Sequence, residues 1–375
     1  MAEVELPPGR RVVVAEFAED PGAAIEHHVA LVEQAPPDRA SLGPRDVLVE
    51  IRSAAVGWVD LLMTSGQYQH MPSPPYTPGL EYAGVVAWTG AAVPPTAVPV
   101  GSAVYVDGLL AGPRSLGAYQ AYGGWATYAV APAESVRPLP EGLSFDQACN
   151  LLGSYETAYH CLVTCGKVQP GETVLIHGAS GATGLAAVHL AKLLGATVIA
   201  TGRSQQKLAV VKAQGADHVL SCQSEDGTAG VRRFRDDIKA LTGGAGVDVV
   251  YDGVGGDITV ESLRCLKFGG RLLIVGWAAT PNVARGKGLR GAPNANQLPT
   301  NLLMMKALTV QGCPTVLSTL HDPSLRPPRL DRIMRWVAEG KIVPHVSHVF
   351  PLGEFKEAMR AKWRGEVIGG CVLRP

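Results

Sequence analysis

The sequence predicts an α/β protein whose second half folds as a doubly wound parallel sheet. Short apolar runs alternate there with helical patterns, beginning with TVLIH at 173–177 and the amphipathic segment LAAVHLAKLLG at 185–195. Further apolar runs of strand length follow at 197–201, 218–220, 247–252, 271–276 and 308–312. Such strands are buried on both faces, and each parallel neighbour is reached through a helical crossover.

The first 150 residues have a different pattern of apolar and turn-forming residues, which predicts a second, β-rich domain. Alternating or β-branched apolar residues occur between Gly/Pro clusters at 12–17, 46–54, 84–88 and 103–106. A chain of 375 residues is also too long for one ordinary core. The tail, with helices near 330–339 and 354–362 and a strand near 370–373, is expected to return to the first domain. We therefore place one domain at 1–152 and 315–375 and the other at 153–314.

Composition excludes several classes of partner. Lys plus Arg and Asp plus Glu both number 33, so the net charge of zero favours neither nucleic acid nor an anionic membrane as a partner. No apolar run reaches the roughly 18 residues that a membrane helix needs, and the opening MAEVELPPGRR does not resemble a secretory signal. The seven cysteines are irregularly spaced, as expected of free thiols in a reducing compartment. We expect a cytoplasmic protein that acts on a small molecule.

The strongest motif is HGASGATG at 177–184, between a predicted strand and a predicted helix. A dinucleotide pyrophosphate needs backbone N–H groups at a helix N-terminus, and glycines let the chain turn and approach it closely. The spacing is GxxGxxG, and an ordinary turn between strand and helix is the alternative interpretation. The predicted contacts in this motif are Gly178, Ser180, Gly181, Ala182, Thr183 and Gly184.

The end of the second strand of this domain predicts which dinucleotide binds. Sites for NAD usually place Asp or Glu there to bind the ribose 2′-hydroxyl. This chain instead has Thr201, Gly202, Arg203 and Ser204, with Lys207 a turn later. Guanidinium and ammonium groups pair with a 2′-phosphate, so the sequence predicts NADPH. The alternative is that both cations are solvated surface groups.

Four further motifs occur in a fixed order along the chain. They are PGLEYAG at 78–84, GGWATY at 123–128, LPEGLS at 139–144 and TAY at 157–159. Together with the glycine motif, they resemble the medium-chain dehydrogenase/reductase superfamily over nearly all 375 residues. The resemblance implies a GroES-like catalytic domain, a Rossmann domain for NADPH, and a homodimer formed through the strand at 308–312.

Zinc-dependent members of this superfamily bind the metal through Cys, a His in GHExxG, and a second Cys. This chain has Gly57, Leu80 and approximately Gly153 at those places, and no cysteine before Cys149. Gly and Leu cannot replace soft thiolate and imidazole ligands, so no metal is expected. The chain most resembles the zinc-free quinone oxidoreductase branch, whose members reduce quinones or activated C=C bonds with NADPH.

The resemblance also assigns roles to single residues. Tyr68 matches a tyrosine near the substrate cleft and is the candidate catalytic residue, although it could equally pack beneath a loop. Thr157 matches a threonine beside the nicotinamide, and Asn301 is a candidate for a late cofactor contact. Asp60 and Glu81 are expected to be structural.

The ends of the fourth and fifth strands should line the nicotinamide crevice, because ligands bind at the carboxyl ends of parallel strands. The residues predicted there are Gly253, Val254, Gly276 and Trp277. A family tyrosine that contacts the cofactor phosphate would fall at Cys222, which is a departure from the pattern. The segments 280–300 and 109–122 are candidates for a substrate lid.

These features predict an NADPH-dependent enzyme that transfers hydride to a quinone, an enone or an enoyl thioester. Neither zinc nor a Tyr-x-x-x-Lys pair is available to form an alkoxide, which disfavours alcohol oxidation. Two alternatives stay open: a zinc-free carbonyl or alcohol dehydrogenase, and an NADPH-binding protein with little catalysis.

Overall fold

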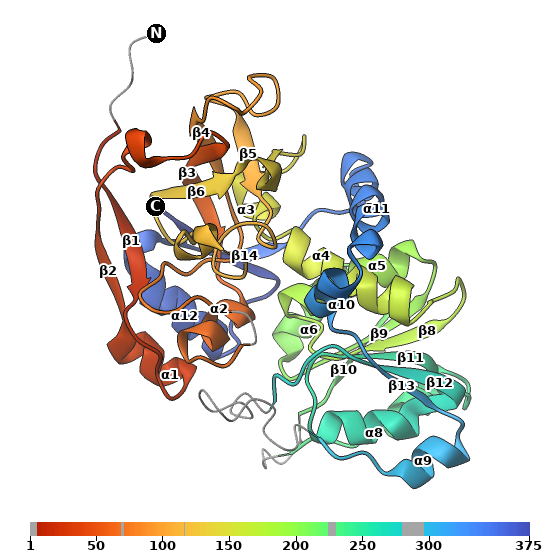
Figure 1. The fold of residues 1–375 in the computed structure, drawn as a ribbon. Coiled ribbons are helices and arrows are strands. Elements are labelled where there is room, and N and C mark those ends of the chain that lie inside the picture. Colours follow the sequence, from red (N-terminus) through yellow and green to blue (C-terminus); the bar gives the residue numbers. More distant parts are fainter. Residues whose placement is uncertain (1–5, 69–70, 116, 224–229, 280–295) are drawn as a thin grey trace. The chain divides into compact units, whose positions relative to one another are not determined.

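The computed structural model describes residues 6–68, 71–115, 117–223, 230–279 and 296–375. The chain divides into two compact units (Figure 1). The described residues of the first, which we call the β-rich unit, are those within 6–153 and 343–375. Those of the second, the parallel-sheet unit, lie within 154–279 and 296–342.

The β-rich unit is built on a seven-stranded sheet with the order β14-β15-β3-β4-β5-β7, in which β6 also pairs with β3. Its strands are β3 (Asp46–Ala55), β4 (Tyr82–Thr89), β5 (Ala103–Val106), β6 (Tyr128–Pro132), β7 (Val136–Pro138), β14 (Val346–Pro351) and β15 (Gly370–Arg374). A separate hairpin joins β1 (Gly9–Val14) to β2 (Val29–Gln34). The helices of this unit are α1 (Pro21–Ala23), η1 (Ala24–His28), η2 (Arg39–Ser41), α2 (Trp58–Thr64), η3 (Ala118–Ala121), η4 (Ala133–Ser135), α3 (Phe145–Ala148), η7 (Leu352–Glu354) and α12 (Phe355–Trp363).

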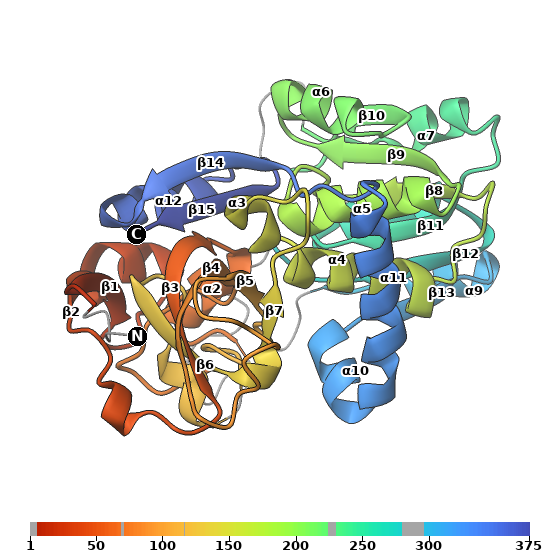
Figure 2. The same cartoon turned by 90° about the horizontal axis from the view of Figure 1, so that it is seen from above.

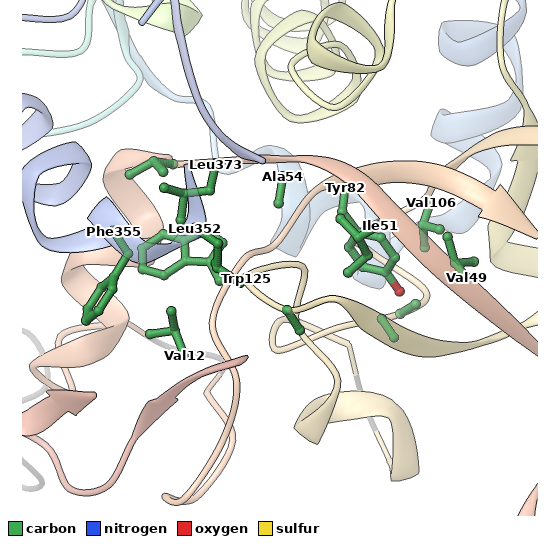
Figure 3. Close-up of a cluster of buried hydrophobic side chains, with 14 of the residues drawn as sticks. Val12, Val49, Ile51, Ala54, Tyr82, Val106, Trp125, Leu352, Phe355 and Leu373 are labelled. Carbon is green, nitrogen blue, oxygen red and sulfur yellow. The ribbon is translucent and has the colours of Figure 1, made fainter. Parts of the chain in front are cut away.

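The core of this unit joins both ends of the chain. Trp125 is fully buried and packs in one cluster with Val12 from β1, Phe355 from α12 and Leu373 from β15 (Figure 3). The indole N–H of Trp125 donates to the carbonyl of Ala55 over 2.9 Å, so its one polar atom is satisfied. The final strand therefore returns to the N-terminal sheet, as its apolar pattern predicts.

The parallel-sheet unit holds six parallel strands in the order β10-β9-β8-β11-β12-β13 (Figure 2). They are β8 (Thr173–Ile176), β9 (Thr197–Gly202), β10 (His218–Ser221), β11 (Val247–Asp252), β12 (Leu266–Ile274) and β13 (Thr309–Gly312). The helices are α4 (Leu152–Tyr159), η5 (His160–Cys165), α5 (Ala182–Leu193), α6 (Gln205–Ala213), α7 (Arg235–Leu241), α8 (Asp257–Cys265), α9 (Thr300–Met305), α10 (Thr315–His321), η6 (Pro323–Leu325) and α11 (Arg326–Ala338). Helices α4, α5 and α11 lie on one face of the sheet, and α8 and α9 lie on the other (Figure 1). This strand order is that of a doubly wound Rossmann fold.

The segment 315–342 packs with the parallel-sheet unit, whereas the sequence placed it with the β-rich domain. A buried ion-pair cluster gives the reason. Glu156 on α4 accepts from the guanidinium of Arg326 over 2.7 Å and from that of Arg329 over 2.9 Å, and Arg329 also donates to Thr319 on α10. Removing one partner of such a buried cluster would leave an uncompensated charge, which fixes α10 and α11 against α4.

Candidate cofactor site

The glycine motif forms the turn between β8 and α5. Gly178 has a φ of +61°, a left-handed conformation that favours glycine, and its carbonyl accepts the N–H of Gly181 over 2.9 Å. Gly181 is the N-cap of α5, and no side chain caps this helix. The first N–H groups of a helix have no partner within it, so those of Ala182, Thr183 and Gly184 are available to an anion.

Gly184 is required by packing. A Cβ at this position would collide with the carbonyl oxygen of Gly178, so only glycine lets α5 approach the turn this closely. At Gly178 itself a Cβ would stand 3.1 Å from the side chain of Val254, which is tighter than ordinary contact. The turn and helix N-terminus therefore fit a dinucleotide pyrophosphate, with Ser180 half-buried in the same turn.

The end of β9 lies directly beside this turn, because the N–H of Ala179 donates to the carbonyl of Thr201 over 3.2 Å. Ser204 caps α6, and its hydroxyl accepts the N–H of Lys207 over 3.4 Å. Arg203 is exposed and has no ion-pair partner among the described residues. The structure thus places the chain segment that carries both predicted cations directly after the strand end that borders the predicted phosphate turn.

The ends of β11 and β12 form a second cluster. The carboxylate of Asp252 accepts the N–H groups of Val254 and Gly255, each over 2.9 Å, and the hydroxyl of Thr259 over 2.5 Å. The carbonyl of Asp252 accepts the N–H of Val275 over 2.8 Å, which ties the two strand ends together. The predicted residues Gly253, Val254, Gly276 and Trp277 are therefore neighbours at the carboxyl edge of the sheet, and Trp277 is 49% exposed.

Two contributors to this edge were not predicted from the sequence. Asp252 shapes the 253–255 turn, and the amide of Asn296 donates to the carbonyl of Gly256 over 3.0 Å. The signal for Asp252 was present, since a lone carboxylate ends the apolar run VDVVY and precedes GVGG. Asn296 gave no comparable signal, because it follows a segment with little periodicity.

Three predicted site residues remain: Thr157, Tyr68 and Asn301. Thr157 is half-buried on α4 of the parallel-sheet unit, and Tyr68 is half-buried after α2 in the β-rich unit, so their roles stay predictions. Asn301 is exposed on α9, which leads to Lys306, and the Lys306 ammonium binds carbonyls at the C-terminal end of α8. That end of α8 lies at the amino edge of the sheet, whereas Asn301 stands near the opposite end of α9, so its role also stays a prediction.

The two candidate lid segments differ in what the structure describes. Most of 280–300 lies outside the described residues, which resume at Asn296. The 109–122 segment consists of turns and the short helix η3, without a strand in its described part.

The three positions that correspond to zinc ligands lie next to two carboxylates of the β-rich unit, the buried Asp60 and the half-buried Glu81. The N–H groups of Gly57 and Leu80 donate to Asp60 over 2.8 and 3.0 Å, and the N–H of Gly153 donates to Glu81 over 2.7 Å. Burial raises the pKa of Asp60 to about 6, against the opposing effect of these N–H groups. Both carboxylates thus bind backbone groups, which is the expected structural role.

The described residues form neither a cluster of metal ligands nor a membrane-spanning helix. Within these residues, no three His, Cys, Asp or Glu side chains are grouped so that they could hold a metal ion. None of the helices described is both long enough and apolar enough to span a bilayer.

Comparison with known proteins now identifies the class. The family model described as alcohol dehydrogenase GroES-like domain matches residues 43–141, and the model described as zinc-binding dehydrogenase matches residues 182–323. A quinone oxidoreductase-like protein 2 homolog of Nematostella vectensis is 33% identical over 335 residues, which cover 89% of this chain and 82% of the relative. The quinone oxidoreductase-like protein 2 of Mus musculus is 31% identical over 87% of this chain and 85% of its own length.

Solved structures agree with this assignment. The Escherichia coli quinone oxidoreductase complexed with NADPH has a TM-score of 0.75 and 25% identity, covering 98% of this chain and all of its own. A mycobacterial protein complexed with NADPH has a TM-score of 0.76, also at 25% identity and 98% coverage of this chain. The chain belongs to the medium-chain dehydrogenase/reductase superfamily and is related to its quinone oxidoreductases. The predicted combination of a Rossmann domain and a GroES-like domain is confirmed.

Proposed function

We propose that this protein transfers hydride from NADPH to a quinone, or to the activated C=C bond of an enone or enoyl thioester, without zinc. The observation that carries the proposal is the chemistry of positions 57, 80 and 153. Gly, Leu and Gly offer no donor side chain, so these residues cannot present a Lewis acid to an alcohol oxygen. Reduction of a quinone or a conjugated carbonyl needs less charge stabilisation from the protein, because the developing negative charge spreads over a phenolate or enolate.

The bound cofactor would supply the hydride, and the chain would hold it along the carboxyl edge of the sheet. The uncapped N-terminus of α5 would bind the pyrophosphate, and Arg203 and Lys207 would face the 2′-phosphate. The turns at 253–255 and 275–277 would bound the nicotinamide end. Named relatives that were solved with NADPH support this choice of cofactor.

On the substrate side, Tyr68 is the proposed donor to the developing oxyanion. A phenolic hydroxyl can stabilise an enolate or phenolate oxygen by donating one hydrogen bond. The proton that completes the reduction can come from solvent, so the site needs no dedicated acid. Positioning and exclusion of water are then the main contributions of the chain.

The test is a substrate panel. NADPH oxidation is followed with quinones, enones, enoyl-CoA thioesters and aldehydes, and NADP⁺ reduction is followed with simple alcohols. We expect a quinone or a conjugated carbonyl to be the fastest substrate. Faster oxidation of a simple alcohol would favour a zinc-free alcohol dehydrogenase, and tight NADPH binding without turnover of any compound would favour a binding protein.

Replacing Tyr68 with Phe tests the finer assignment. The variant should turn over accepted substrates more slowly, by about tenfold or more if one oxyanion donor is lost, while its dissociation constant for NADPH stays unchanged. An unchanged rate with every accepted substrate would remove Tyr68 from the mechanism and leave the reaction class intact.

A further inference from the structure

His177 opens the glycine motif but faces away from the space that an anion would occupy. Its side chain is buried, with 1% of its surface exposed, and its ring packs against Phe234 at a centroid distance of 5.6 Å. Nδ1 lies 2.7 Å from the hydroxyl of Thr201 on β9, and Nε2 lies 2.6 Å from the hydroxyl of Ser262 on α8. One imidazole thus connects β8, β9 and α8 behind the phosphate turn.

The directions of these hydrogen bonds follow from the proton count. The hydroxyl of Ser262 donates its single proton to the carbonyl of Ile258 over 2.6 Å, so it must accept from the Nε2–H of His177. Burial lowers the pKa of His177, which favours the neutral ring, although Asp252 acts in the opposite direction. A neutral ring with its proton on Nε2 has a free lone pair on Nδ1, which accepts the hydroxyl proton of Thr201.

Thr201 is therefore tied twice to the phosphate turn. Its hydroxyl donates to His177, and its carbonyl accepts the N–H of Ala179 over 3.2 Å. The next carbonyl, that of Gly202, is held from the other side by the N–H of Cys222 over 2.9 Å and by its thiol over 3.3 Å. The exposed Arg203 is the next residue in the chain, so its backbone extends from a segment that is held on both sides.

We propose that His177, through its hydrogen bond to Thr201, is a positioning residue that determines the preference for NADPH over NADH. The bond fixes where β9 ends relative to the phosphate turn, and so sets the distance from the pyrophosphate to Arg203. NADH carries no 2′-phosphate, so its binding depends on the turn but not on this distance. The inference rests on the proposed function, because it assumes that Arg203 faces the 2′-phosphate of NADPH.

The second bond of the same ring supplies an internal control. Ser262 lies on α8, outside the segment that carries Arg203, and without its hydroxyl the ring can still bond the Thr201 hydroxyl through Nδ1, as acceptor or as donor. Thr201→Val removes one hydroxyl from one side of the imidazole, and Ser262→Ala removes one from the other. Both sites are fully buried, and the Ser262 hydroxyl also donates to Ile258, so Ser262→Ala should lose at least as much thermal stability as Thr201→Val.

The experiment measures dissociation constants for NADPH and NADH, with thermal unfolding of each variant. Loss of one buried hydrogen bond corresponds to roughly fivefold in affinity, so Thr201→Val should reduce the NADPH-to-NADH preference by about that factor. Ser262→Ala should weaken both cofactors equally and leave the preference unchanged. A purely structural role would lower stability in both variants without changing the ratio in either.

Two substitutions of His177 separate its nitrogens and keep the test decisive if Thr201→Val fails to fold. His177→Asn places an amide oxygen, which can accept a hydrogen bond, near the position of Nδ1, so this variant should retain most of the preference. His177→Gln places a donor near Nε2 and should lose the preference. Equal preference in these variants, or an unchanged ratio in Thr201→Val, would overturn the inference while NADPH binding stands. A wild-type protein that binds both cofactors equally would overturn the proposed cofactor and this inference with it.

Discussion

The backbone N–H of Leu80 donates a hydrogen bond to the carboxylate of Asp60 over 3.0 Å. Leu80 stands where the zinc-dependent members of the superfamily have a histidine, and its buried side chain offers no ligand atom. Gly57 occupies another such position, and its N–H binds the same carboxylate. The carboxylate that would neighbour a metal site is thus engaged by the backbone.

Activity should therefore survive strong chelators, since the proposed reaction has no step that needs a bound metal. The protein is incubated with excess chelator, desalted, and assayed with its best substrate from the panel; elemental analysis is run on the untreated sample. A zinc-dependent alcohol dehydrogenase treated in parallel serves as the positive control. About one zinc per chain in the purified protein, or activity restored by added zinc, would show this prediction to be wrong.

Asp60 should also make stability depend on pH. Burial raises its pKa to about 6 from an ordinary value of 3.8, so the folded state binds more protons between these values. Its contribution to the free energy of unfolding therefore falls as the pH rises from about 4 to about 6, by up to about 3 kcal/mol. Asp60→Asn cannot titrate, so the stability advantage of the wild type over this variant should shrink across that window.

Urea unfolding of both proteins at several pH values between 4 and 7 measures this difference, with each pH chosen so that folding is reversible. Glu141→Gln, at an exposed turn, is the matched control and should show no such trend. An advantage that grows with pH would mean that the N–H groups of Gly57, Gly79 and Leu80, which donate to Asp60, outweigh its burial.

Arg203 should carry much of the discrimination between cofactors. Its side chain is exposed at the end of β9 without an ion-pair partner among the described residues, and charge-assisted bonds to phosphate are strong. Arg203→Ala should weaken NADPH binding by about tenfold or more and leave NADH binding nearly unchanged. Lys212→Ala, which removes an exposed cation from the far end of α6, is the control. Equal losses for both cofactors would place Arg203 outside the 2′-phosphate site.

The pattern of apolar residues was sufficient to predict those elements whose local sequence agrees with their burial in the fold. The apolar runs at 173–177 and 247–252 correspond to β8 and β11. Parallel strands that are buried on both faces are apolar throughout, so each can be recognised from its own sequence. Helix α11 begins at Arg326, four residues before the predicted start near 330. Two prolines hid this first turn, although proline is tolerated at the first positions of a helix.

The glycines of the cofactor site were predictable from the sequence, whereas its long-range hydrogen bonds were not. Glycines in the phosphate turn are dictated by local backbone geometry, so Gly178 and Gly184 could be read from the motif. The bonds of His177 join it to residues 24 and 85 positions away, and only the folded sheet brings these together. The 315–342 segment was misplaced for the same reason, because its ion pairs to Glu156 span about 170 residues.

The last prediction concerns β13, which stands at one end of the parallel sheet. Among the described strands it pairs only with β12, and three of its four residues are exposed. An edge strand with free N–H and C=O groups invites pairing with another chain, and a two-fold axis lets two identical edges satisfy each other. Met304 and Met305, on the helix that leads into β13, are 71% and 68% exposed. We therefore expect a homodimer formed along this edge.

Sedimentation of the wild type at micromolar concentration should give the mass of two chains of 39.3 kDa. Met304→Glu with Met305→Glu should shift the equilibrium toward monomer, because burying two carboxylates at an interface is costly. Val100→Glu is the matched control, since Val100 is 61% exposed and belongs to the β-rich unit, whereas β13 belongs to the parallel-sheet unit. A monomeric wild type would refute the dimer outright. A wild-type dimer that tolerates both glutamates would instead move the interface away from α9 and the β13 edge.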